Sequence, residues 1–170
     1  SGVGEEEIEA ICERVSITTK VADVTELKAA LEKGGIVKLT EDMTISDEDQ
    51  MVIAAGQSAT LDLAGHTITA NRAYPLVANG GELVITGDGE ISGRGRLAAV
   101  QNGGKLTIEG GLIKSTGDVA MQATGAGSQI EINGGEVEAQ EFGALITTGA
   151  ELVMNGGTVE AFDNAGIGGN

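Results

Sequence analysis

The stretches that decide the fold are KLTIEGGLIK at positions 105–114, QIEINGGEVE at 129–138 and ELVMNGGTVE at 151–160. Two earlier stretches follow the same pattern, ATLDLAGHTIT at 59–69 and ELVITGDGEIS at 82–92, and GIVKLTEDMTI at 35–45 is a weaker copy. The first apolar residue of each strong copy recurs after 22, 23, 24 and 22 residues, at Leu61, Leu83, Leu106, Ile130 and Leu152. Self-similarity at a short period indicates units that stack on one another.

Each repeat contains three short apolar segments. The first precedes the glycine turn, the second follows it, and the third lies a few residues further on, as at 98–101 and 119–122. Apolar and polar residues alternate within them, which is the period of a β-strand with one buried face. The sequence therefore predicts an all-β solenoid over 35–170, with three short strands in each coil of 22–24 residues and about six coils.

The pattern resembles the right-handed parallel β-helix of the pectate-lyase-like superfamily, over positions 35–170. The resemblance implies a right-handed coil but no single activity, because that fold carries lyases, hydrolases, tailspikes and plain fibres. One glycine recurs at the same turn of each coil, and we expect it to adopt a positive φ, which glycine reaches at little cost. These glycines are Gly65, Gly87, Gly110, Gly134 and Gly156. Asn133 and Asn155 precede two of the turns, and we expect them to bond to each other.

Residues 17–34 predict a strand followed by a helix that covers the open first coil. Asp23 and Glu26 have the spacing of a capping box at the helix N-terminus. Leu27, Ala30 and Leu31 share one face of the helix. A solenoid needs such a cap because its exposed apolar end invites aggregation.

The two ends of the chain bear on assembly. Residues 1–16 predict a further short amphipathic helix, with Ile8, Ile11 and Val15 on one side. It would pack on its own domain or meet copies of itself, and a trimer is the favoured homo-oligomer. At the other end the repeat predicts another strand at about position 174. We therefore expect 35–170 to be part of a longer solenoid, or its last coil to be covered by another subunit.

Composition excludes several classes of protein. The chain has 26 Asp and Glu against 10 Lys and Arg, a formal net charge of −16, which argues against binding to nucleic acid. It contains no apolar run of about 18 residues, so no membrane span is expected. Cys12 is the only cysteine and His66 the only histidine, so we expect no metal site and no cofactor.

A first candidate binding site is a group of basic residues on adjacent coils. Arg72, Arg94 and Arg96 are expected to lie near Lys114. They could bind an acidic sugar, or they could be ordinary surface charges.

A second candidate site is acidic. Glu138 and Glu141 align with Glu160 and Asp163 of the next coil. At a strand spacing of about 4.8 Å such carboxylates could form a hydrolase pair, a weak cation or partner site, or a solvated acidic face. The sequence runs familiar from β-helix lyases and hydrolases are absent, so we assign no catalytic residue.

These observations favour a non-enzymatic structural or adhesive fibre module. The stretch GVGEEEIEAI at 2–11 is similar to the openings of fibre modules in phage and prophage virions, including head and tail fibres. That resemblance implies location in a virion, with a host glycan or a virion protein as partner. Two alternatives stay open: a polysaccharide lyase or hydrolase of the same fold, and a secreted or bacterial cell-surface module that binds glycans or a host partner.

Overall fold

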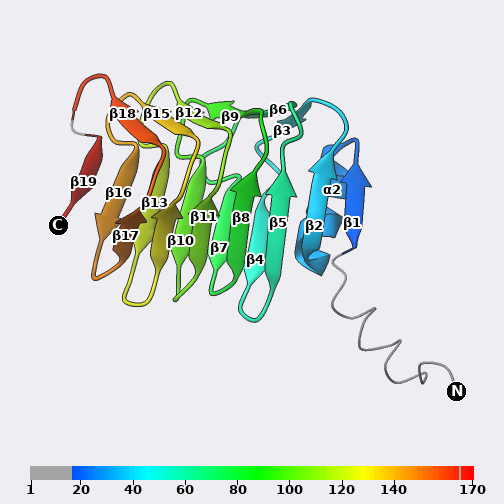
Figure 1. Ribbon diagram of the computed structural model, residues 1–170, viewed down its shortest axis with the longest axis horizontal. Helices are drawn as coiled ribbons and strands as arrows, with labels where there is room; N and C mark the ends of the chain where they lie inside the picture. Colours follow the sequence, from blue (N-terminus) through cyan, green and yellow to red (C-terminus); the bar gives the residue numbers. More distant parts are fainter. Residues whose placement is uncertain (1–16, 165) are drawn as a thin grey trace, which may run out of the picture.

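The computed structural model describes residues 17–164 and 166–170. This part of the chain forms a parallel β-solenoid of about six coils with three strands in each coil and one short helix at the N-terminal end (Figure 1). The strands form three sheets that run along the solenoid. Sheet A contains β1 (Thr18–Val21), β2 (Gly35–Leu39), β5 (Ser58–Asp62), β8 (Glu82–Thr86), β11 (Lys105–Ile108), β14 (Gln129–Ile132) and β17 (Glu151–Met154).

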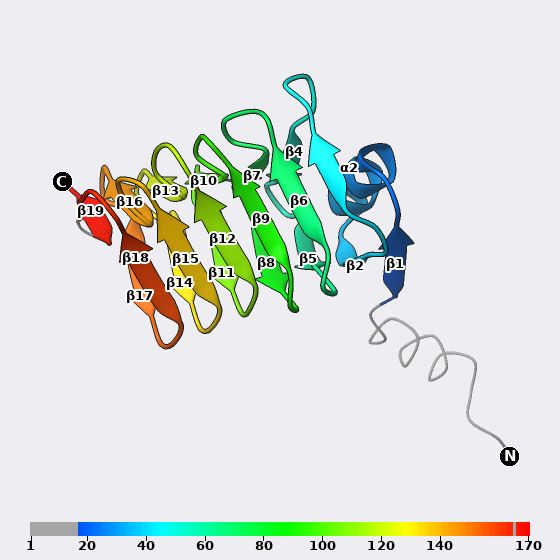
Figure 2. The ribbon, with the colours of Figure 1, turned by 90° about the horizontal axis from the view of Figure 1, so that it is seen from above.

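Sheets B and C complete each coil. Figure 2 shows the strands of sheet B side by side in chain order. Sheet B contains β3 (Met43–Ile45), β6 (Thr67–Ala70), β9 (Glu90–Gly93), β12 (Leu112–Ser115), β15 (Glu136–Ala139) and β18 (Thr158–Ala161). Sheet C contains β4 (Met51–Ala54), β7 (Leu76–Asn79), β10 (Ala98–Gln101), β13 (Met121–Thr124), β16 (Ala144–Thr147) and β19 (Ile167–Gly169).

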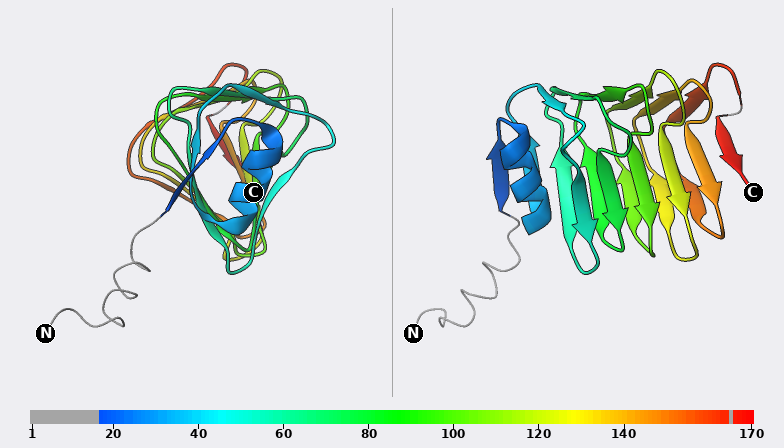
Figure 3. Two further views of the ribbon diagram at one scale, coloured as in Figure 1. Left: turned by 90° about the vertical axis from the view of Figure 1, so that its right-hand side faces the viewer. Right: turned by 180° about the vertical axis from the view of Figure 1, so that it is seen from behind.

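The coil is right-handed, as expected. Sheet A runs upward on the near side of the molecule in Figure 1, and sheet C runs downward in the view from behind in Figure 3. The chain therefore passes from front to back over the top while it advances toward the C-terminus. This is the hand that the twist of parallel strands favours for crossover connections.

The core is a set of stacked rows of aliphatic side chains. Ile108 and Ile132 are register partners in sheet A, and both are fully buried, which confirms the predicted inward face. Ile68, Ile91, Ile113, Val137 and Val159 form the corresponding row of sheet B, also as predicted. Period-2 alternation thus places every second residue of a strand inside the solenoid.

The predicted register of the first strong repeat was wrong by two residues. Leu61 pairs with Ile85, and Leu83 pairs with Ala59, so the first step in that row is 24 residues and not 22. A shift of two residues keeps every side chain on the same face of the strand, so the apolar pattern could not distinguish the two registers. The first steps in sheets B and C are 25 residues, from Met43 to Ile68 and from Met51 to Leu76.

The recurrent glycine has two different roles. Gly65 and Gly87 have φ values of 84° and 80°, as expected. In the three later turns the expectation was wrong, because the next glycine has the positive φ. Those residues are Gly111, Gly135 and Gly157, with φ of 84°, 74° and 72°.

In the last two of these turns the first glycine of the pair is required for space. A Cβ atom on Gly134 would lie 2.5 Å from the carbonyl oxygen of Glu109, and one on Gly156 would lie 2.4 Å from that of Asn133. Neighbouring coils therefore lie in close contact at these turns. Asn155 Nδ2 also donates to Asn133 Oδ1 at 2.8 Å, which confirms the expected bond between the stacked asparagines.

Helix α2 (Val24–Lys33) covers the N-terminal end of the coils, as seen along the axis in Figure 3. The backbone N–H of Glu26 donates to the Asp23 carboxylate at 2.8 Å, and the Glu26 carboxylate accepts from the N–H of Ala22 at 2.7 Å. Leu27 and Leu31 are fully buried, which confirms the predicted inner face. The second predicted helix at 1–16, with Ile8, Ile11 and Val15, lies outside the described residues.

The last described coil is less buried than the others. Met154 is 43% exposed and Ile167 is 46% exposed, although their register partners Ile132 and Ala144 are fully buried. The expected continuation or covering of this coil stays a prediction.

Candidate functional site

A groove of about 390 Å³ crosses the outer face of sheet C over β4, β7, β10 and β13. Its floor is apolar, because Val52, Val77 and Ala99 are register partners that point outward. Polar side chains surround this floor, namely Gln50, Tyr74, Asn79, Gln101, Gln122 and Thr124. The groove thus combines an apolar strip with amide and hydroxyl groups, as ligand-binding clefts do.

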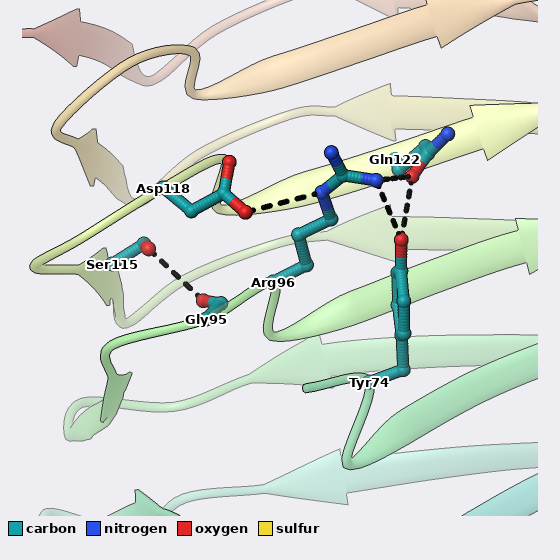
Figure 4. A network of polar contacts seen from close by, with 6 residues as sticks. All are labelled: Tyr74, Gly95, Arg96, Ser115, Asp118 and Gln122. Carbon is teal, nitrogen blue, oxygen red and sulfur yellow. Dashed lines mark hydrogen bonds and ion pairs between the residues drawn. The ribbon is translucent and has the colours of Figure 1, made fainter. Parts of the chain in front are cut away.

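One side of the groove is built by a network of three side chains from three coils (Figure 4). Arg96 Nη1 donates to the Tyr74 hydroxyl and to Gln122 Oε1, both at 2.7 Å. The Tyr74 hydroxyl donates to the same Gln122 oxygen at 2.8 Å. The Arg96 guanidinium also lies 5.9 Å from the centroid of the Tyr74 ring. These contacts hold the tyrosine and the glutamine in one arrangement.

The backbone of Tyr74 is strained and held from both sides. Its φ is +55°, a left-handed conformation that a bulky side chain rarely adopts. Gln50 Nε2 donates to the Tyr74 carbonyl at 2.8 Å, and the Tyr74 N–H donates to the carbonyl of Arg96 at 2.6 Å. Strain maintained in this way is characteristic of functional sites.

Arg96 is a partly buried cation with a nearby counter-ion. Its Nε lies 3.5 Å from Oδ2 of Asp118, an ion-pair contact that does not meet hydrogen-bond geometry. The hydrogen bond to Tyr74 raises the pKa of Arg96, burial opposes this effect, and the Asp118 and Glu141 carboxylates add to the rise. Arg96 is therefore charged under all ordinary conditions.

The segment next to Arg96 is also held in place. The buried Ser115 hydroxyl donates to the Gly95 carbonyl at 2.9 Å.

The other two arginines of the predicted basic group lie elsewhere. The Arg72 guanidinium donates to the carbonyls of Asp47 and Ala73 at 3.0 and 3.1 Å, so it braces a neighbouring loop. Arg94 is exposed and lines a second hollow of about 410 Å³, together with Arg72 and Asp118. Arg96 alone of the three arginines contacts residues that line the sheet C groove.

The predicted acidic face lies on sheet B. Glu138 and Glu160 are register partners, as the alignment implied. Lys114 Nζ lies 3.0 Å from Oε2 of Glu138, and this hydrogen-bonded contact raises the pKa of Lys114. Asp163 accepts from the Gln140 side chain. Glu138 and Asp163 thus have partners within the coil stack, and none of the four carboxylates lines the sheet C groove.

Histidine and carboxylate side chains do not gather into a metal site in the part of the chain that the structure describes: no group of three or more His, Cys, Asp or Glu comes together there. His66 Nδ1 lies 3.3 Å from the Asp42 carboxylate on an exposed turn.

Sequence reasoning missed Tyr74 and Gln122. Tyr74 is one of three aromatic residues in the chain, and it stands just before Pro75 at the start of a sheet C strand. This position could have identified Tyr74 as a candidate site residue, because an aromatic residue at the edge of an aliphatic repeat departs from the repeat pattern. Gln122 carries no such signal, because outward polar residues occur on every strand.

Comparisons with protein-family models, with curated proteins and with solved structures found no match for this chain. Within 17–164 and 166–170, no helix has the length and apolar character needed to span a membrane.

Proposed function

We propose that this chain is a non-enzymatic adhesive module of a fibre, a stiff solenoid whose sheet C groove binds an extended glycan. The groove crosses four neighbouring strands along the solenoid axis. At about 4.8 Å between strands this is a length of roughly 14 Å. A short stretch of a polysaccharide can lie along it.

The chemistry of the lining carries the proposal. Asn79, Gln101 and Gln122 line the groove with side-chain amide groups, which can hydrogen-bond to sugar hydroxyl groups. Val77 and Ala99 supply a floor for the apolar face of a sugar ring. The network around Tyr74 prepares this surface before a ligand arrives, which lowers the entropic cost of binding.

The same lining supports binding rather than turnover. Glycoside hydrolysis needs two carboxyl groups beside the scissile bond, and polysaccharide elimination needs a base. The described residues that line the groove include no Asp, Glu, His or Lys. The Glu138 and Glu160 carboxylates project from a different sheet.

Ion pairs between coils support the structural part of the proposal. Lys105 Nζ lies 2.5 Å from Oε2 of Glu131 on the next strand of sheet A, and Lys114 contacts Glu138 in sheet B. Such contacts tie each coil to the next along the axis. A phage or prophage virion stays the favoured setting, on the similarity at 2–11, and a secreted or cell-surface module is the alternative.

Glycan binding by matched variants tests this function. Tyr74→Ala removes the groove side chain, and Phe162→Ala removes an exposed aromatic residue after β18 as a control. On an array of bacterial and host polysaccharides we expect Tyr74→Ala to lose about tenfold or more in affinity, while Phe162→Ala binds like the parent. If both variants bind glycans as tightly as the parent protein, the sheet C groove is not the binding site. Release of reducing ends or unsaturated sugars from a bound polysaccharide would contradict a non-enzymatic role.

A further inference from the structure

We propose that the sheet C groove selects uncharged glycans over acidic ones, and that Asp118 maintains this selectivity by offsetting the charge of Arg96. The inference rests on the proposed function, because it names the ligand class of the same groove.

The groove is neutral in a strongly charged protein. Charged residues make up 21% of the chain and its net charge is −16, yet the described lining residues include no Asp, Glu, Lys or Arg. The carboxylate of an acidic sugar would lose water against Val77 and Ala99 without gaining a cation inside the groove. Such a loss of hydration is costly for a charge. The overall negative charge also slows the approach of a polyanion.

Arg96 is the cation that bonds to groove residues, and two of its three guanidinium nitrogens already face partners. Its Nη1 is bonded to Tyr74 and to Gln122, and its Nε faces Asp118. The Asp118 carboxylate supplies the opposite charge at 3.5 Å, so little net positive field reaches the groove. Arg96 is thus a positioning residue for its two neighbours.

The network also fixes which atoms of Gln122 meet a ligand. Gln122 Oε1 accepts from both Arg96 and Tyr74, so the amide cannot turn without opposing donors to donors. Its Nε2 is the group left to donate. A sugar hydroxyl or ring oxygen accepts from it without carrying any charge.

Titration with matched sugars tests the inference. The probes are glucose against glucuronate and galactose against galacturonate, followed through the side-chain amide NMR signals of Gln101 and Gln122. For the parent protein we expect the neutral sugars to shift these signals and the uronates to bind several-fold more weakly. Equal or tighter binding of the uronates would overturn the selectivity while leaving glycan binding intact. No response to any of the four sugars would overturn the proposed function together with this inference.

Three variants test the role of Asp118. Asp118→Asn removes the counter-ion, and we expect uronate affinity to rise about two- to fivefold, the range of a partly exposed charge pair. Glu160→Gln removes the same charge from sheet B and should leave the ratio of neutral to acidic binding unchanged. Asp118→Glu keeps the charge and should keep the parent ratio. If Asp118→Asn behaves like Glu160→Gln, Asp118 does not set the selectivity.

Discussion

The hydroxyl group of Tyr74 donates to Gln122 Oε1 at 2.8 Å, although 48 residues separate the two along the chain. Tyr74 precedes β7 and Gln122 lies in β13, so the tyrosine side chain reaches past β10 to the coil beyond. Arg96, which enters from the coil between them, bonds to both. Three coils are therefore joined at one point on the outer face, in addition to the backbone bonds of the sheet.

A double-mutant cycle measures this connection. Tyr74→Phe removes one hydroxyl group, and we expect it to lower the free energy of unfolding by about 1 kcal/mol. Gln122→Leu removes the shared acceptor. Because the two residues are in contact, the double variant should lose less than the sum, with a coupling of about 0.5–1 kcal/mol by urea denaturation. Additive losses would mean that the network does not stabilise the fold.

Charge inside a coil should unfold the solenoid. Ile132→Asp places a carboxylate in the fully buried row of sheet A, and Ile108→Asp does so one coil earlier. Lost burial and an unpaired charge together should cost at least about 4 kcal/mol. Val153→Asp is the matched control, because Val153 is the register partner of the outward Glu131. Circular dichroism during thermal unfolding compares them, and similar melting of Ile132→Asp and Val153→Asp would contradict the assigned inward face.

Two glycines separate backbone strain from crowding. Gly103 and Gly135 have φ of 78° and 74°, but a Cβ atom would meet nothing within 4 Å at Gly103 and would lie 2.6 Å from the Gly111 carbonyl oxygen at Gly135. Gly103→Ala should therefore cost about 1–2 kcal/mol, the price of the left-handed conformation. Gly135→Ala should cost clearly more, because two coils must move apart. Equal losses in denaturant titrations would show that crowding between the coils has no effect on stability.

The Glu131 carboxylate should contribute to acid stability. Hydrogen bonds from Lys105 and Asn133 lower the pKa of Glu131 below its usual value. Its stabilising effect is therefore present above the unfolded-state pKa and is lost as the pH falls through the lower, folded-state value. We expect Glu131→Gln to flatten the fall in melting temperature between about pH 5 and pH 3. Glu136→Gln, an exposed residue of β15, is the control and should follow the parent curve.

Assembly is tested by removing residues 1–16. If Ile8, Ile11 and Val15 form the predicted interface between copies of the chain, the protein is a trimer that becomes a monomer when this segment is deleted. Light scattering on a size-exclusion column at micromolar protein gives the mass of both forms. If both forms are monomers, Ile8, Ile11 and Val15 do not form a subunit interface, and the fibre proposal is weakened.

The strand register of sheet A shows what the sequence pattern could not predict. The step from Leu61 to Leu83 looked equivalent to the later steps, yet Leu61 pairs with Ile85. The apolar pattern tolerates shifts of two residues, so it predicts which face is buried but not which residues are neighbours. The turns decide the register, since each must close without collision between coils, as at Gly134 and Gly156.

The sequence by itself determined the solenoid, its three strands per coil, the capping helix and the inward rows, because these follow from local alternation and from a repeat that recurs along the chain. Only the tertiary structure decided the site. Arg96 is 22 residues from Tyr74 and 26 from Gln122. Their meeting depends on the register of three stacked coils and on the strained backbone of Tyr74. Outward side chains are not constrained by burial, so the sequence pattern that specifies the core carries no information about which of them come into contact.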